Sequence, residues 1–137
     1  MPEALVGILV GSESDRERMQ DALDELTARG IAHEFEVRSA HRQPDAVAEY
    51  GRTARERGLR VLIAGAGLAA ALPGVLAAHT DLPVIGVPLR SSKSVLDGLD
   101  ALLSIVQMPP GVPVACVGVD NARNAAVLAA RIIGPSL

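Results

Sequence analysis

Residues 4–30 read ALVGILVGSESDRERMQDALDELTARG, and their pattern indicates a buried β-strand followed by an amphipathic helix. The first seven residues are apolar without interruption, which is typical of a strand covered on both faces. Apolar residues then recur at helical spacing, at Met19, Ala22, Leu23 and Leu26. Ser14 and Glu17 fit a capping box, which predicts that the helix begins at the end of GSES, and Gly30 predicts where it ends.

The same pattern of strand and helix continues along the chain. Four further strands are predicted, at residues 32–37, 60–64, 83–87 and 112–119. Four further helices are predicted, at residues 44–57, 68–78, 97–105 and 121–133. Apolar strands that alternate with helices favour a parallel sheet with helices on both faces. We therefore expect a single α/β domain over residues 1–137, a three-layer α/β/α sandwich with a five-stranded parallel sheet in flavodoxin-like order.

Composition and charge narrow the possible partners. The net charge is −3 and no run of Lys or Arg is present, which argues against nucleic acid and anionic membranes. The longest apolar stretch is interrupted by Pro73, so we expect no membrane span and a cytoplasmic location. Cys116 stands alone in an apolar run, where a small buried hydrophobe is the simplest interpretation.

The balance of apolar and charged residues indicates self-association. Apolar residues make up 49% of the chain, while charged residues make up 21% and aromatic residues 1%. A small monomer exposes much of its surface, so part of so apolar a surface should be covered by other copies of the chain. We expect a homo-oligomer.

Five loops should meet at one edge of the predicted sheet. They read GSESD (11–15), SAHRQP (39–44), AGAG (64–67), PLRSSKS (88–94) and VDNARN (119–124). Ligands of open parallel sheets bind outside the carboxyl ends of the strands. Glycine, serine and paired charges are concentrated in these loops, so we expect the functional site at this edge.

The loop GSESD is suited to a phosphate group. Its glycine lets backbone approach closely, and two hydroxyls precede a helix N-terminus that favours an anion. The alternative is that Ser14 is only a cap and Asp15 only a first-turn acid. The AGAG loop lacks the spacing of a dinucleotide fingerprint or a P-loop, so no nucleotide cofactor is predicted.

His41 is the candidate for proton transfer. It lies at the active edge between Ser39 and Arg42, whose planar guanidinium suits phosphate or carboxylate. Histidine gives and takes protons near neutral pH, which makes general acid/base catalysis the natural hypothesis. No second histidine, cysteine or carboxylate cluster accompanies it, so no metal is expected. His33 and His79 fall at the opposite edge and are interpreted as structural or exposed. The residues thus predict a phosphorylated small molecule and a proton carried by His41.

Several motifs resemble one known family over about residues 5–133. They are GSESD, SAHRQP, AGAGLAAALPG, GLDALLSIVQMPPGVPVA and NARNAAVLAARI, in this order. This set resembles the PurE family, class I: enzymes of purine biosynthesis that interconvert N5-carboxyaminoimidazole ribonucleotide and 4-carboxy-5-aminoimidazole ribonucleotide. The resemblance implies a cofactor-free mutase assembled as an octamer, in which a histidine drives decarboxylation and recarboxylation of a phosphoribosyl substrate.

The resemblance also assigns roles to individual residues. It implies that His41 is the acid/base. It also implies that the substrate is bound by Ser12, Ser14, Asp15, Ser39, Arg42 and the backbone amides of Ala66 and Gly67. A related branch carboxylates aminoimidazole ribonucleotide directly, but its members tend to have lysine in place of Arg42. A non-catalytic flavodoxin-like domain that binds a phosphoribosyl ligand is a further alternative.

Three departures from the family pattern bear on these roles. Ala71 stands where many mutases have a histidine, so His41 is expected to work without that partner. The loop at 89–97 is about two residues longer than is usual in the family, which leaves its covering of the imidazole ring open. Relatives commonly continue into another helix beyond the position of Leu137, so the chain is expected to lack that extension.

Overall fold

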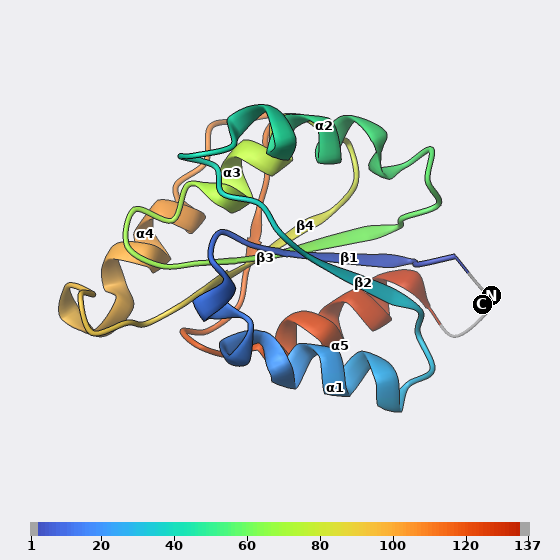
Figure 1. Ribbon diagram of the computed structural model, residues 1–137, viewed down its shortest axis with the longest axis horizontal. Helices are drawn as coiled ribbons and strands as arrows, with labels where there is room; N and C mark the ends of the chain where they lie inside the picture. The colour runs from blue at the N-terminus through green and yellow to red at the C-terminus, as the bar shows by residue number, and fades with distance from the viewer. Residues whose placement is uncertain (1–2, 135–137) are drawn as a thin grey trace.

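The computed structural model describes residues 3–134 and has a five-stranded parallel sheet at its centre (Figure 1). The strands are β1 (Val6–Val10), β2 (His33–Val37), β3 (Val61–Ala66), β4 (Val84–Pro88) and β5 (Ala115–Cys116). Their order is β2-β1-β3-β4-β5, and every pairing is parallel. This is the flavodoxin-like order, so the predicted fold class is confirmed.

Helices cover both faces of the sheet. The α-helices are α1 (Gln20–Ala28), α2 (Pro44–Ala54), α3 (Leu72–Ala77), α4 (Leu99–Val106) and α5 (Ala122–Ile133). Three short 3-10 helices are η1 (Glu13–Asp15), η2 (Glu17–Met19) and η3 (Leu96–Gly98). Figure 1 shows α1 and α5 beneath the sheet and α2 and α3 above it. The three layers predicted from the sequence are therefore present.

The central strands are buried on both faces because their side chains alternate between two cores. From β1, Val6, Ile8 and Val10 pack toward α1 and α5, whereas Leu9 packs toward α2 and α3. All residues of β1 are buried, as are the first five of β3. This two-sided burial explains why these strands are apolar throughout.

The predicted capping box at the start of the first helix is wrong. Ser12, in extended conformation, accepts the hydrogen bond of the Ser14 N–H at 3.3 Å, so the helical segment begins with η1. Two 3-10 turns then precede α1, which starts only at Gln20. The cap moved because the chain turns directly after Gly11, two residues earlier than the sequence pattern predicted.

Two other elements also differ from prediction, one helix and one strand. The third helix begins at Leu72 rather than at residue 68, because Leu68 has a φ of 55° and cannot start a right-handed helix. The fifth strand was predicted over residues 112–119, but only Ala115–Cys116 form it. Pro113 lacks the N–H that a longer ladder needs, and Asp120 has a φ of 59° that turns the chain away.

Candidate active site

A small pocket opens at the carboxyl edge of the sheet, where the loops after β1, β2 and β3 meet. Its volume is about 120 Å³. The lining residues are Gly11, Asp15, Ser39, Ala40, His41, Ala66, Gly67, Ala69, Ala70, Ala71 and Leu72. Five residues predicted from the sequence therefore surround one cavity: Asp15, Ser39, His41, Ala66 and Gly67. Most of the remaining lining residues are alanine, so the side chains of Asp15, Ser39 and His41 are the ones that bring polar chemistry to the pocket.

The loop after β1 delivers Asp15 to the pocket. Burial raises the pKa of the Asp15 carboxyl, and the charge of Arg18 offsets part of that rise. The predicted Ser12 and Ser14 do not line the pocket; their hydroxyls lie 2.9 Å apart and are hydrogen-bonded to each other. Ser14 is exposed and Ser12 is half-buried, and both lie in the same loop as Asp15.

The loop after β2 is closed by Ser39 and Gln43. Ser39 Oγ accepts the hydrogen bond of the Arg42 N–H at 3.2 Å, and Gln43 Oε1 accepts that of the Ser39 N–H at 3.3 Å. The Gln43 N–H in turn donates to Ser39 O at 2.8 Å. This double closure holds His41 at the tip of the turn, where it lines the pocket. Gln43 was not among the predicted residues; its place directly before the proline that opens α2 was the available signal.

Arg42, unlike His41, does not line the pocket. Its side chain is exposed. Within residues 3–134 it has no ion-pair partner. An exposed guanidinium one residue after His41 is available to an anionic group of a ligand that extends out of the pocket.

The loop after β3 forms the floor of the pocket. Ala66 O accepts the hydrogen bond of the Leu89 N–H at 2.9 Å, which fixes the end of β3 against β4. A Cβ at Gly67 would lie 3.0 Å from Leu89 O, so a glycine is required for this close approach. Leu68 follows in left-handed conformation and is 44% exposed. The predicted amides of Ala66 and Gly67 thus belong to a tightly constrained turn.

The loops after β4 and β5 are tied to each other. The Arg90 N–H donates to Asp120 Oδ1 at 2.8 Å, and the Arg90 guanidinium pairs with Asp120 Oδ2 at 3.3 Å. None of the residues lining the pocket comes from these loops. The longer loop at 89–97, whose covering of the imidazole ring was an open question, is therefore not part of the pocket wall. The pocket is therefore built from the first three strand ends.

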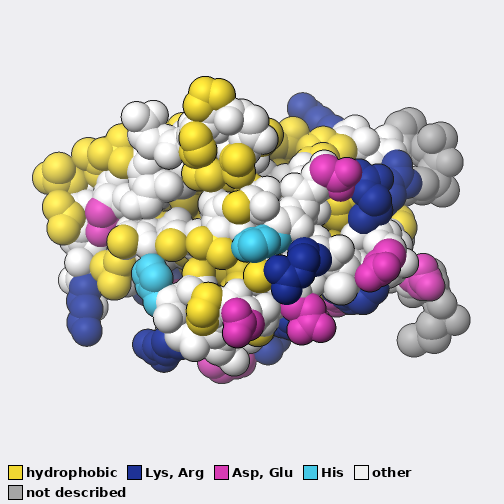
Figure 2. Space-filling view, turned by 90° about the horizontal axis from the view of Figure 1, so that it is seen from above, with side chains coloured by type: hydrophobic (Ala, Val, Ile, Leu, Met, Phe, Trp, Pro, Cys, Tyr) yellow, Lys and Arg dark blue, Asp and Glu magenta, His cyan; other side chains and the backbone are white. Residues whose placement is uncertain are grey.

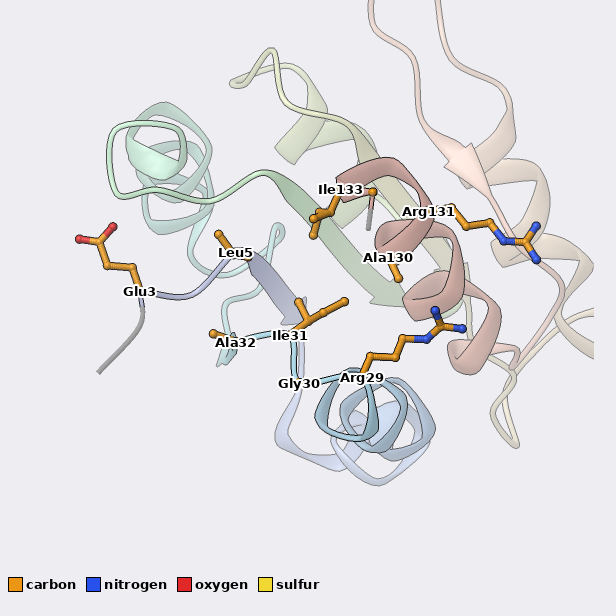
Figure 3. Close-up of a pocket in the computed structure, with 10 residues that line it drawn as sticks. Glu3, Leu5, Arg29, Gly30, Ile31, Ala32, Ala130, Arg131 and Ile133 are labelled. Atoms are coloured by element: carbon orange, nitrogen blue, oxygen red, sulfur yellow. The ribbon is translucent and has the colours of Figure 1, made fainter. Parts of the chain in front are cut away.

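A larger groove of about 930 Å³ lies at the opposite edge of the sheet (Figure 3). Figure 3 shows Leu5, Ile31 and Ile133 around its centre, with the side chains of Arg29 and Arg131 directed away. It contains no predicted site residue, so its size does not make it the candidate active site. Among residues 3–134 no group of three or more His, Cys, Asp or Glu could hold a metal ion. No helix in the same range is long and apolar enough to cross a membrane.

The chain is thus a flavodoxin-like α/β protein with a pocket at the strand ends, where proteins of this fold bind their ligands. A family model described as AIR carboxylase matches residues 5–136. The chain belongs to the AIR carboxylase family, which confirms the resemblance found in the sequence.

Named relatives and a solved structure agree with this membership. The N5-carboxyaminoimidazole ribonucleotide mutase of Pyrococcus abyssi is 59% identical over 93% of this chain and 72% of its own length. The phosphoribosylaminoimidazole carboxylase of Schizosaccharomyces pombe is 55% identical over 97% of this chain, but over only 24% of its own length. A crystal structure of PurE from Treponema denticola has a TM-score of 0.82 at 32% identity, covering 95% of this chain and 80% of that chain.

Proposed function

We propose that the protein is an isomerase of purine biosynthesis that interconverts N5-carboxyaminoimidazole ribonucleotide and 4-carboxy-5-aminoimidazole ribonucleotide. The observation that carries this proposal is His41 in a small, largely alanine-lined pocket beside Asp15 and Ser39. This chain aligns with nearly three quarters of the length of a relative named as the mutase. It aligns with only 24% of the length of the fungal carboxylase. The direct carboxylase is therefore the less favoured alternative.

The pocket is suited to a reaction that passes through free carbon dioxide. We assign His41 to donate a proton to the carbamate nitrogen, after which the bond from this nitrogen to the carboxylate carbon breaks and carbon dioxide is released. Ring carbon C4 then attacks carbon dioxide, and its proton passes to His41, which restores the protonated histidine. No proton is gained or lost overall. A cavity of about 120 Å³ would keep carbon dioxide close to C4.

The same cavity is too small for a whole ribonucleotide, because pockets for such ligands usually exceed about 300 Å³. We therefore assign it to the reacting imidazole end of the substrate. Ser39 and Asp15 would contact the substrate where it leaves the pocket. The hydroxyls of Ser12 and Ser14 and the exposed guanidinium of Arg42 would then hold the ribose and phosphate outside the pocket.

The test follows the ultraviolet absorbance of 4-carboxy-5-aminoimidazole ribonucleotide after addition of protein. Wild type should convert the substrate at a rate that added bicarbonate does not change. His41→Asn should reduce kcat by at least about 100-fold, as expected for loss of a general acid/base. His79→Asn, which changes a histidine outside the pocket, is the matched control and should keep full activity.

Other outcomes identify the alternatives. Conversion of aminoimidazole ribonucleotide that depends on bicarbonate would favour the direct carboxylase. Substrate binding without conversion, unchanged in His41→Asn, would favour a non-catalytic phosphoribosyl-binding domain.

We also propose that the protein acts in the cytoplasm as a homo-octamer. A charged phosphoribosyl substrate does not cross membranes unaided, so the enzyme must share its compartment.

Apolar side chains are exposed at the end of the molecule that carries η3 and α4 (Figure 2). They are Val95, Leu96, Leu99, Leu103 and Val106. A surface of this kind supports contact with other copies. Sedimentation at micromolar concentration as a 14.2 kDa monomer would contradict the assembly.

A further inference from the structure

Arg38 joins three elements at the base of the loop that carries His41. Its backbone N–H donates to Val10 O at 2.8 Å, at the end of β1. Its side-chain Nη1 donates to Ala46 O at 2.8 Å, in the first turn of α2. Arg38 lies directly before the loop 39–43, and Ala46 lies just after it, in α2. A single residue therefore fixes the distance between the two ends of this loop and also ties it to β1.

The Arg38 guanidinium is itself held in one orientation. Its Nε and Nη2 lie 2.8 and 2.7 Å from the same Glu36 carboxylate oxygen. Its central carbon lies 5.1 Å from the centre of the Tyr50 ring. Tyr50 is buried, and Arg38 itself is only 27% exposed. Contacts on three sides restrict a side chain that would otherwise be flexible, so its bond to α2 has a defined geometry.

We propose that Arg38 is a positioning residue for the active site. By fixing both ends of the loop 39–43, it sets where His41 and Ser39 stand relative to Asp15 on the neighbouring loop. The inference rests on the proposed function, because it assigns His41 to proton transfer. It also explains the presence of a charged residue next to a loop that already contains Arg42. Lysine could not replace it, since one ammonium cannot reproduce a fork directed at both Glu36 and Ala46.

Arg57 provides a matched control within the same cluster. It also pairs with a β2 carboxylate, Glu34, at 3.2 Å, and it lies 4.9 Å from the centre of the Tyr50 ring. Its side chain is 39% exposed, similar to that of Arg38. Arg57, however, follows the end of α2, and among the described residues its side-chain hydrogen bonds go to Glu34 and none to the loop 39–43. The two arginines therefore resemble each other in environment and differ in whether they fix the loop.

The experiment compares Arg38→Ala, Arg38→Lys and Arg57→Ala in the full-length protein. Arg38→Ala should lower kcat by about 10- to 100-fold, the cost of a small misplacement of a reacting group. Arg57→Ala should keep wild-type kcat and KM, although urea unfolding should show similar losses of stability for both alanine variants. Added guanidinium ion at non-denaturing concentration should restore part of the activity of Arg38→Ala. Arg38→Lys should remain impaired.

A readout that does not depend on turnover separates this proposal from the proposed function. The chain has three histidines, so the imidazole resonance of His41 is assignable by NMR in protein with labelled histidine. Arg38→Ala should shift or broaden this resonance, whereas Arg57→Ala should not. An inactive wild type would refute the proposed function, yet the resonance would still test the positioning. Unchanged kcat or an unchanged His41 resonance in Arg38→Ala would overturn the proposal, as would equal activity losses in both alanine variants.

Discussion

Gly7→Ala should strongly destabilise the fold, although it adds one methyl group to a β-strand. Gly7 lies in the middle of β1, where it pairs with Glu34 on one side and Leu62 on the other. A Cβ at this position would overlap the hydroxyl oxygen of Tyr50 and would lie 3.1 Å from its Cζ. Tyr50 cannot move without losing its 2.6 Å hydrogen bond to Glu34.

Two costs add in this variant. Overpacking of a dense core costs about 1 to 3 kcal/mol. Loss of a hydrogen bond to a charged group costs about 1.5 to 3 kcal/mol. Gly7→Ala should therefore lower the free energy of unfolding by about 2.5 to 6 kcal/mol, a large part of the stability of a small domain.

A double-mutant cycle with Tyr50→Phe tests this reasoning. Phenylalanine removes the overlapping oxygen, so Gly7→Ala should cost only about 1 kcal/mol in that background, the low end for overpacking. Urea unfolding of the four proteins measures the coupling, which we expect to exceed about 1.5 kcal/mol. Additive effects of the two substitutions would refute the argument, because they would mean that the new methyl group does not meet Tyr50.

Two further predictions concern residues beside the pocket. Leu68→Gly should be more stable than Leu68→Ala by about 1 kcal/mol, because both lose the side chain but only glycine relieves the left-handed backbone; equal unfolding midpoints would contradict this. Burial raises the pKa of the Asp15 carboxyl, so ionisation of this group opposes folding, and its cost grows as pH rises from the usual aspartate range through the folded-state pKa. Asp15→Asn should therefore raise stability at pH 7 but not below about pH 3, while weakening substrate binding; an equal gain at both pH values would contradict the assignment.

The centres of the strands and the site edge were predictable from the sequence for simple reasons. Uninterrupted apolar runs can be buried only in a sheet covered on both faces, and a parallel sheet brings its strand ends to one edge. Asp15 follows β1, whereas Ser39 and His41 follow the neighbouring β2, so their convergence followed from the order of elements alone. The pattern needed no knowledge of individual contacts.

Features that depend on single contacts were not predictable in this way. The cap formed at Ser12 instead of Ser14 because of where the chain turns after β1, and either serine suits a cap. The late start of α3 follows from the left-handed backbone conformation of Leu68. A leucine side chain gives no indication of such a conformation. Arg38 and Gln43 act across a loop. Arg38 bonds to Ala46, eight residues away, and Gln43 bonds to Ser39, four residues away, so helix and strand periodicity gave no signal for either.

The cluster around Tyr50 also gives the protein a built-in optical probe. The sequence contains one tyrosine and no tryptophan, so tyrosine fluorescence comes from this single ring. Arg38 and Arg57 both lie against it, and its hydroxyl donates to Glu34. Light emitted by the unlabelled chain therefore reports on the junction of β2 and α2, where Arg38 precedes the loop that carries His41. Stopped-flow mixing could follow movement of that junction as substrate arrives, without attaching any dye.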